Sequence, residues 1–315
     1  MQLDGVLFFP VTPFGPGSLL AADVLAEHVR MGLEHGPGGV FVACGTGEFS
    51  ALSLAEHDLA VRTAVEVVAG SSQTRAVPVI AGAGGPLGAA LEQAEQAALA
   101  GADGLLLMPP YLSAGPASGL HAYVRAITEA AGLPVILYQR GGVVLEPSAA
   151  VELARLPGVV GLKDGNGDID RMARIVRAIR HEIGPDFTFF NGLPTAELTQ
   201  PAYRAIGVDL YSSAAFCFVP EVAAAYCRAQ EEDPELAERL LAGFYAPLVE
   251  LRSLVPGYAV SLVKAAVRLR GLDAGPVRPP LVEPTPEHLD ELSRIIKTGL
   301  EIIEPELAEF ARGDT

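Results

Sequence analysis

The chain lacks several features that mark whole classes of protein. Its three cysteines, Cys44, Cys217 and Cys227, are odd in number and lie in apolar surroundings, which excludes a disulfide framework and predicts packed thiols. Its six histidines form no HxxxH pair and no Cys/His cluster, so the sequence predicts no metal site. It has no uncharged apolar run of ~18 residues, so we expect no membrane span. The segment Met1–Gly5 has no features of an export signal, and we therefore expect a cytoplasmic protein.

Positive charge is also scarce. The formal net charge of −16 argues against a nucleic-acid or anionic-membrane partner. An anionic substrate would therefore have to be bound by local donors, against the field of the whole protein. Only three lysines, Lys163, Lys264 and Lys297, stand against 19 arginines among the 315 residues.

Of the three lysines, Lys163 has the sequence context expected of a nucleophile. It ends the apolar run Val159–Lys163 and is followed by the glycine-rich turn 164–168. In an apolar pocket the pKa of a lysine falls, and its neutral amine can attack a carbonyl carbon. The alternative is a lysine that forms a structural ion pair with Asp164 or Asp168. Lys264, in the apolar run Ala259–Val267, is a competing nucleophile, but we expect it to snorkel to solvent or to be paired on a packed helix.

The chain alternates between short apolar runs and helical segments, and this pattern predicts the fold. The apolar runs are Val6–Phe9, Val40–Cys44, Val77–Ala81, Gly104–Met108, Val135–Tyr138, Val159–Lys163, Phe187–Asn191 and Val208–Ser212. They are hydrophobic almost throughout, as strands buried on both faces should be. Eight such units predict an α/β fold of the (β/α)8 TIM-barrel type. The runner-up is a doubly wound open sheet, but no GxGxxG motif follows the first strand.

The segments between these runs have the three- and four-residue apolar spacing of helices. They are Leu20–Glu34, Ser53–Ala69, Leu87–Ala100, Gly119–Ala131, Pro147–Leu156, Ile169–Ile183 and Pro194–Ile206. Ser53 and Glu56 form the Ser-x-x-Glu pattern of a capping box. Beyond Pro220 the chain predicts only helices: Val222–Gln230, Pro234–Leu254, Tyr258–Arg270 and Pro286–Glu309. We therefore expect a barrel in residues 1–230 and a C-terminal helical extension, 231–315, packed on it.

Polar side chains gather at the predicted carboxyl ends of the strands, where TIM barrels carry their functional residues. The candidates are Thr46, Glu48, Tyr111, Tyr138, Lys163, Asn191, Ser212 and Ser213. Their convergence with a buried lysine indicates an enzyme.

Cys44–Glu48 reads Cys-Gly-Thr-Gly-Glu. Backbone N–H groups around Gly45 and Thr46 could form a nest for a carboxylate, with the threonine hydroxyl as a further donor. The alternative is an ordinary tight turn that needs glycine.

Five residues at or near strand ends allow two interpretations each. Tyr138 could relay protons beside an imine-forming lysine, or be a buried tyrosine with its hydroxyl bonded to backbone. Arg140 could bind a second carboxylate, or be a surface arginine. Asn191, Ser212 and Ser213 could contact substrate, or satisfy backbone groups at strand ends.

Five stretches carry a resemblance to a known superfamily: Pro10–Phe14, Gly45–Glu48, Pro109–Tyr111, Tyr138 and Gly161–Asp164. They resemble, in the same order, the dihydrodipicolinate synthase/N-acetylneuraminate lyase superfamily. The resemblance implies a class I, Schiff-base lyase on a (β/α)8 barrel with a helical C-terminal extension. It also implies a homotetramer built as a dimer of dimers.

Within that superfamily the chain most closely resembles the 5-dehydro-4-deoxyglucarate dehydratases. The resemblance runs through Gly45–Phe49, Ala81–Gly84, Gly101–Tyr111, Lys163–Ile169, Gly192–Glu197, Tyr211–Ala214, Gly257–Lys264 and Asp273–Leu281. It implies that Lys163 forms the imine, that Tyr138 relays protons and that Gly45 and Thr46 hold a carboxylate. The implied substrate is a sugar diacid and no cofactor is needed. Tyr111, Arg140, Asn191, Ser212 and Ser213 are the candidates for its remaining contacts.

The chain departs from the synthases at two positions. Gly45-Thr46 stands where they have two threonines, and Leu112 stands where they have a second tyrosine. Tyr138–Gly142 also reads Tyr-Gln-Arg-Gly-Gly, where the dehydratases are expected to have Tyr-Asn-Arg-Asp-Asn. The alternatives are a pyruvate-dependent aldolase, a synthase-like enzyme, or a non-catalytic barrel that binds an α-keto acid.

Overall fold

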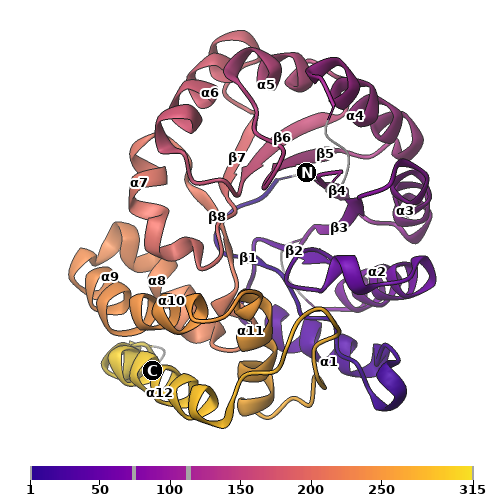
Figure 1. Cartoon of the computed structure of the whole chain (residues 1–315). Coiled ribbons are helices and arrows are strands. Elements are labelled where there is room, and N and C mark those ends of the chain that lie inside the picture. Colours follow the sequence, from indigo (N-terminus) through magenta and orange to yellow (C-terminus); the bar gives the residue numbers. More distant parts are fainter. Residues whose placement is uncertain (1, 73–75, 111–114, 314–315) are drawn as a thin grey trace.

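The computed structural model describes residues 2–72, 76–110 and 115–313, and in it eight parallel strands close into a barrel in chain order (Figure 1). The strands are β1 (Leu7–Phe8), β2 (Gly39–Val42), β3 (Val79–Gly84), β4 (Gly104–Met108), β5 (Val135–Gln139), β6 (Val159–Asp164), β7 (Thr188–Asn191) and β8 (Leu210–Ser213). The barrel closes because β8 pairs with β1, Leu7 opposite Ser212. The predicted (β/α)8 fold is confirmed.

Helices surround the strands and follow the predicted segments closely. They are α1 (Ala22–Leu33), α2 (Leu54–Ala69), α3 (Leu87–Ala100), α4 (Ala117–Ala131), α5 (Pro147–Ala154), α6 (Ile169–Glu182), α7 (Gln200–Ala205) and α8 (Pro220–Glu232). The capping box of α2 is present, since the Glu56 backbone N–H donates to Ser53 Oγ and the Ser53 N–H to the Glu56 carboxylate.

Two predicted helices are interrupted at a proline. The segment Pro194–Ile206 begins with a 3-10 turn, η3 (Ala196–Thr199), before α7, where Pro201 lies in the first turn. The segment Pro234–Leu254 is divided into α9 (Pro234–Leu240), a π-helical turn η5 (Leu241–Tyr245) and α10 (Ala246–Ser253), which has Pro247 in its first turn. Proline has no backbone N–H to continue the α-helical bonding, so the helix changes type before it.

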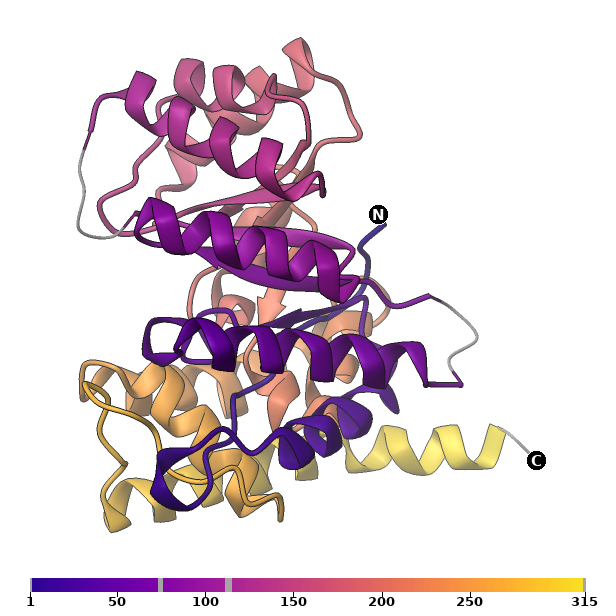
Figure 2. The ribbon, with the colours of Figure 1, turned by 90° about the vertical axis from the view of Figure 1, so that its right-hand side faces the viewer.

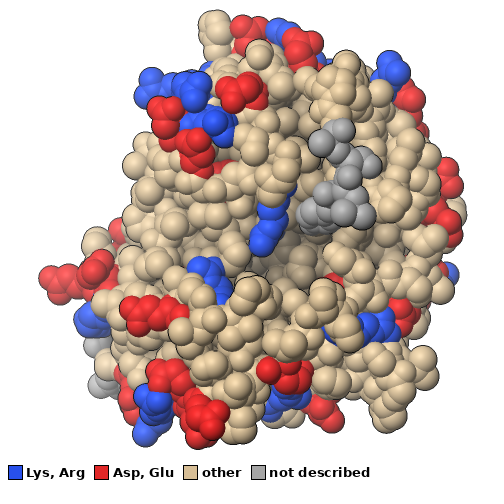
Figure 3. Space-filling view, viewed as in Figure 1, with Lys and Arg blue, Asp and Glu red and all other residues tan. Residues whose placement is uncertain are grey.

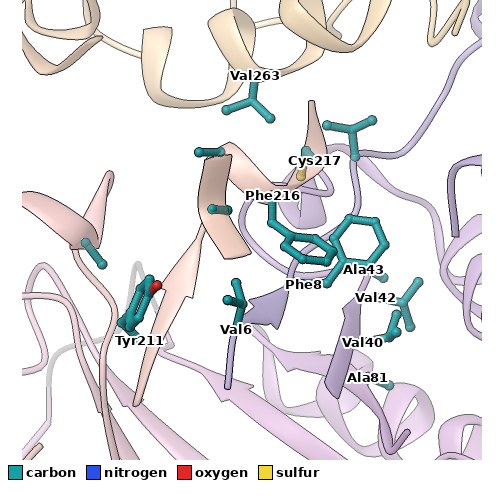
Figure 4. Close-up of a cluster of buried hydrophobic side chains, with 14 of the residues drawn as sticks. Val6, Phe8, Val40, Val42, Ala43, Ala81, Tyr211, Phe216, Cys217 and Val263 are labelled. Carbon is teal, nitrogen blue, oxygen red and sulfur yellow. The ribbon is translucent and has the colours of Figure 1, made fainter. Parts of the chain in front are cut away.

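Two hydrophobic layers hold the barrel together. The first fills its interior with side chains that alternate along the strands, among them Leu7, Phe9, Phe41, Ile80, Leu106, Ile136 and Phe190. The second lies between strands and helices. Figure 4 shows part of it, where Phe8 of β1 packs against Phe216, with ring centres 5.2 Å apart. Side chains on neighbouring positions of a strand therefore face different surroundings.

The last helices, α11 (Tyr258–Leu269) and α12 (Pro286–Gly313), complete an extension gathered beside α8 (Figure 1). The far end of α12 projects from the body of the molecule (Figure 2). The division of the chain after residue 230 stays a prediction. Within the described residues, no helix is both long and apolar enough to cross a membrane.

The extension is attached to the barrel by one buried and one partly buried ion pair. Lys264 Nζ lies 2.7 Å from Glu48 Oε1, and the two side chains are 0% and 1% exposed. Arg278 forms an ion pair with Glu56 at the start of α2. Phe14 lies between the two cations, 3.9 Å from Lys264 Nζ and 3.8 Å from Arg278 Cζ. Lys264 is therefore paired on a packed helix, as predicted.

Candidate active site

Lys163 lies in an aromatic pocket inside the barrel. Its Nζ atom is 4.0 Å from the centre of the Phe9 ring, 4.7 Å from that of Tyr138 and 5.5 Å from that of Phe190. Burial lowers the pKa of its ammonium group to about 7, although the Cys44 thiol opposes the shift and Arg140 adds to it. A large fraction of Lys163 is therefore the neutral, nucleophilic amine near neutral pH.

The two aspartates that could have formed an ion pair with Lys163 are engaged elsewhere. Asp164 follows Lys163 in β6 and accepts hydrogen bonds from Gln139 Nε2 (2.8 Å) and the Tyr203 hydroxyl. Asp168 caps α6, accepting from the Arg171 N–H. Among the residues the structure describes, no carboxylate lies within 4.0 Å of Lys163 Nζ. Lys163 therefore forms no structural ion pair with Asp164 or Asp168.

Two glycines make room for the pocket. A Cβ atom at Gly192 would lie 2.4 Å from Lys163 Cε, and one at Gly165 would lie 2.8 Å from the Tyr138 hydroxyl. Both glycines are in loops that follow strands, and neither needs a positive φ. They are required for close approach to the two side chains rather than for a turn.

Tyr138 occupies the position of β5 opposite Lys163 in β6. Its hydroxyl donates to the Gly192 carbonyl oxygen (3.0 Å) and accepts from Arg140 Nη1 (2.8 Å). Burial raises the pKa of the phenol, and the Arg140 charge partly offsets that rise. Arg140 is half-buried and extends over Tyr138, with 6.0 Å between Cζ and the ring centre, so it is not an isolated surface arginine.

The loop after β2 contains backbone N–H groups that are available to bind a ligand. Cys44, two residues beyond the end of this strand, lines the barrel interior with Tyr138 and Phe190. The backbone N–H groups of Gly45, Thr46 and Gly47 have no hydrogen-bond acceptor among the described residues. Because unbonded N–H groups in one short turn can bind an anion, this geometry suits a carboxylate.

The underside of this loop is held rigidly. Thr12 Oγ1 donates to the Gly47 carbonyl oxygen (2.7 Å). Glu48, which ends the loop with φ of 55°, accepts from Lys264 and from the Arg278 N–H (2.8 Å). The extension thus fixes the loop that carries the open donors.

The remaining predicted residues are divided between two faces of the barrel. Ser212 points toward the interior, and its Oγ donates to the Asn191 carbonyl oxygen (3.3 Å). Ser213 is buried on the helix side and bonds Glu197 Oε1 (2.5 Å). Asn191 donates to Ala196, Thr199 and Gln200 and accepts from Leu193, so its side chain serves the β7–α7 loop. Tyr111 lies outside the described residues.

The face at this end of the barrel is hollowed at its centre (Figure 3). Acidic side chains lie mainly around the periphery of this face, whereas basic side chains border the hollow. An anionic substrate could therefore bind here despite the net charge of −16, because local cations can attract an anion that the whole protein repels.

The sequence of residues 2–299 matches the model of the dihydrodipicolinate synthetase family. The chain belongs to this family. The chain is 55% identical over 303 residues to a protein named probable 5-dehydro-4-deoxyglucarate dehydratase 1 from Streptomyces coelicolor, covering 96% of this chain and 94% of that protein. It is 38% identical over 296 residues to the 5-dehydro-4-deoxyglucarate dehydratase of Pseudomonas putida, covering 93% and 95%.

Solved structures of family members have the same fold. Dihydrodipicolinate synthase from Bacillus clausii superposes with a TM-score of 0.83 at 28% identity, over 94% of this chain and 97% of that one. The synthase from Cyanidioschyzon merolae with lysine bound gives 0.82 at 30% identity, over 94% and 98%. The relatives named as dehydratases are therefore more similar in sequence than these two synthases.

Sequence reasoning missed two features of this family member. The first is the support of the lysine strand, where Gln139, Asp164 and Tyr203 form a buried hydrogen-bonded group behind β6. Gln139 directly follows Tyr138 and Asp164 directly follows Lys163 in the sequence, and this could have indicated that they support the site. The second is Arg252 of α10, which donates to the Pro194 carbonyl oxygen at the carboxyl end of β7. Nothing in its local sequence marks it.

Proposed function

We propose that this protein is a class I, Schiff-base lyase that converts 5-dehydro-4-deoxy-D-glucarate into 2,5-dioxopentanoate, carbon dioxide and water. The observation that carries the proposal is Lys163, whose amine is buried among aromatic rings and has a pKa lowered to about 7. The relatives that bear this activity in their names match 93% to 96% of the chain.

The reaction begins with the Lys163 amine. It attacks the C5 ketone of the substrate, and loss of water from the carbinolamine leaves an iminium ion. Tyr138 relays protons to and from the carbinolamine oxygen, because its hydroxyl lies beside the lysine and is oriented by Arg140 and Gly192. The open N–H groups of Gly45 and Thr46 hold the adjacent C6 carboxylate.

The iminium ion then serves two bond cleavages. It acidifies C4, so a base removes a C4 proton and the C3 hydroxyl leaves as water, forming a C3=C4 double bond. Cleavage of the C1–C2 bond releases carbon dioxide, and its electron pair moves through the conjugated system to the iminium nitrogen. Protonation and hydrolysis give 2,5-dioxopentanoate and return the Lys163 amine. No redox step is involved.

The proposal is tested by incubating the protein with 5-dehydro-4-deoxy-D-glucarate and following carbon dioxide and 2,5-dioxopentanoate together. Equimolar formation of both is expected. Release of pyruvate without carbon dioxide would instead establish a pyruvate-dependent aldolase. Absence of turnover and of any borohydride-trapped adduct would indicate a non-catalytic barrel that binds keto acids.

We further propose that Ser212 contacts the substrate, since its side chain faces the barrel interior, whereas Ser213 and Asn191 support the loops around the site. A homotetramer built as a dimer of dimers and a cytoplasmic location belong to the same proposal. The family resemblance supports the tetramer, and the three free thiols suit the cytoplasm. Light scattering during gel filtration would measure the assembly directly.

A further inference from the structure

We propose that Arg252, contributed by the C-terminal extension, binds the carboxylate at the far end of the diacid and so selects diacids over monoacids. The inference deepens the proposed function and rests on it, because it assigns a residue to the end of the substrate that the Gly45–Thr46 loop does not reach. It also means that the C-terminal extension contributes a substrate-binding residue.

The position of Arg252 follows from the loop after β7. Gly192 begins this loop, packs against Lys163 and accepts the Tyr138 hydroxyl. Pro194 comes two residues later, and its carbonyl oxygen accepts a hydrogen bond from Arg252 Nη1. Arg252 is therefore fixed to the same short loop that lines the imine-forming lysine.

Arg140 and Arg252 lie close enough for their charges to interact. Arg140 is held at this loop through the Tyr138 hydroxyl, 2.8 Å from its Nη1. Burial lowers the pKa of the Arg252 guanidinium, repulsion by Arg140 lowers it further, and attraction by Glu197 opposes both. Two neighbouring cations repel each other until an anion binds between them, which is the arrangement expected for a carboxylate site.

The guanidinium of Arg252 has N–H donors that are available to a ligand. A guanidinium carries five N–H donors in a planar fork, and the described residues supply an acceptor, the Pro194 carbonyl oxygen, to only one nitrogen. In the part of the chain that the structure describes, no carboxylate lies within 4.0 Å of it. Most other described arginines, such as Arg155 and Arg270, have ion-pair partners. A half-buried arginine with no carboxylate of the described residues within ion-pair distance is suited to an external one.

The test measures recognition of the far carboxylate without requiring the later steps of catalysis. Borohydride traps the Lys163 imine with two probes of six carbons, the diacid 2-oxohexanedioate and the monoacid 2-oxohexanoate. For the unchanged protein we expect half-maximal trapping at a lower concentration of the diacid. Arg252→Met should raise that concentration ~10- to 100-fold for the diacid and leave the monoacid unchanged, because only the diacid loses a charged hydrogen bond.

Two variants complete the design. Arg252→Lys keeps the charge and a donor for Pro194 but loses the planar fork, so it should recover part of the diacid preference and guards against misfolding of the Met variant. Arg294→Met, at an exposed arginine of α12 that pairs with Glu291, should behave as the unchanged protein.

Equal weakening of both probes in Arg252→Met and Arg252→Lys would show a structural role through the loop and overturn the inference. So would an unchanged diacid preference, or its absence from the unchanged protein. Failure of the proposed function is read separately, as absence of carbon dioxide from 5-dehydro-4-deoxy-D-glucarate in the unchanged protein.

Discussion

The hydroxyl of Tyr138 donates to the carbonyl oxygen of Gly192 across 3.0 Å, and the α-carbon of the same glycine is packed against the side chain of Lys163. One residue of the β7 loop thus orients the proposed proton relay and confines the proposed nucleophile. Neighbouring strands bring the parts together, since Tyr138, Lys163 and Phe190 occupy one level of the barrel.

The identity of the nucleophile can be tested by labelling. Treatment with substrate and borohydride, followed by peptide mapping, should place the label on Lys163. Lys163→Met should abolish both label and turnover, whereas Lys297→Met, at an exposed lysine of α12, should retain both. A label on Lys264 in the unchanged protein would refute the assignment.

The rate of imine formation should depend on pH through Lys163 itself. Its folded-state pKa of about 7 means that the neutral amine is the minor form below pH 7 and the major form above it. The initial rate of trapping should rise as pH increases through about 7 and then level off. A rate that continues to rise toward pH 10 would show that the pocket does not lower the pKa.

The same shift has a consequence for stability. Between about 7 and the ordinary lysine value of 10.5 the unfolded chain binds one more proton at Lys163 than the folded chain. The free energy of unfolding therefore rises with pH across this window. Lys163→Met should reduce that rise and leave the part due to Lys264, whose pKa burial lowers to about 8. Urea denaturation at a series of pH values would measure the difference against Lys297→Met.

Removing the hydroxyl of Tyr138 should slow catalysis without disturbing the pocket. Tyr138→Phe keeps the ring beside Lys163 but loses the bonds to Arg140 and Gly192. We expect turnover to fall by ~100-fold or more, the usual effect of losing a positioned proton-transfer group. Tyr258→Phe removes a hydroxyl that bonds His288 in the extension, and its turnover should be unchanged.

Adding one methyl group at Gly192 should displace the lysine. A Cβ atom there would lie 2.4 Å and 2.5 Å from Lys163 Cε and Cγ, so the side chain must move. A shift of about 1 Å at a reacting group can cost ~100-fold in rate, and we expect trapping by Gly192→Ala to slow by that order. Gly88→Ala in α3 meets no atom within 4 Å and should trap at the normal rate.

The buried pair of Lys264 and Glu48 should control stability. Lys264→Met leaves the Glu48 carboxylate buried without its cation and should lower the free energy of unfolding by ~3–5 kcal/mol. The double variant Lys264→Met/Glu48→Gln should recover much of this loss, because no uncompensated charge remains. Lys297→Met, which breaks an exposed pair with Glu301, should cost less than ~1 kcal/mol. Equal losses in Lys264→Met and the double variant would contradict the account.

The amino-acid sequence by itself determined the barrel and the order of its strands. Apolar runs such as Gly104–Met108 could be recognised because parallel strands buried on both faces are hydrophobic throughout. The scarcity of lysine made Lys163 prominent, and its place at the end of such a run put it at the mouth of the barrel. These are local signals, which is why they could be read without coordinates.

Only the tertiary structure decided which side chains face the site. A shift of one residue along a strand turns a side chain from the interior to the helices, so Ser212 and Ser213 diverge although both end β8. Partners distant in the chain were equally out of reach. Glu48 meets Lys264, and Arg252 meets Pro194, because the extension folds back on the barrel. Such pairings depend on how whole helices pack, and no local sequence pattern encodes them.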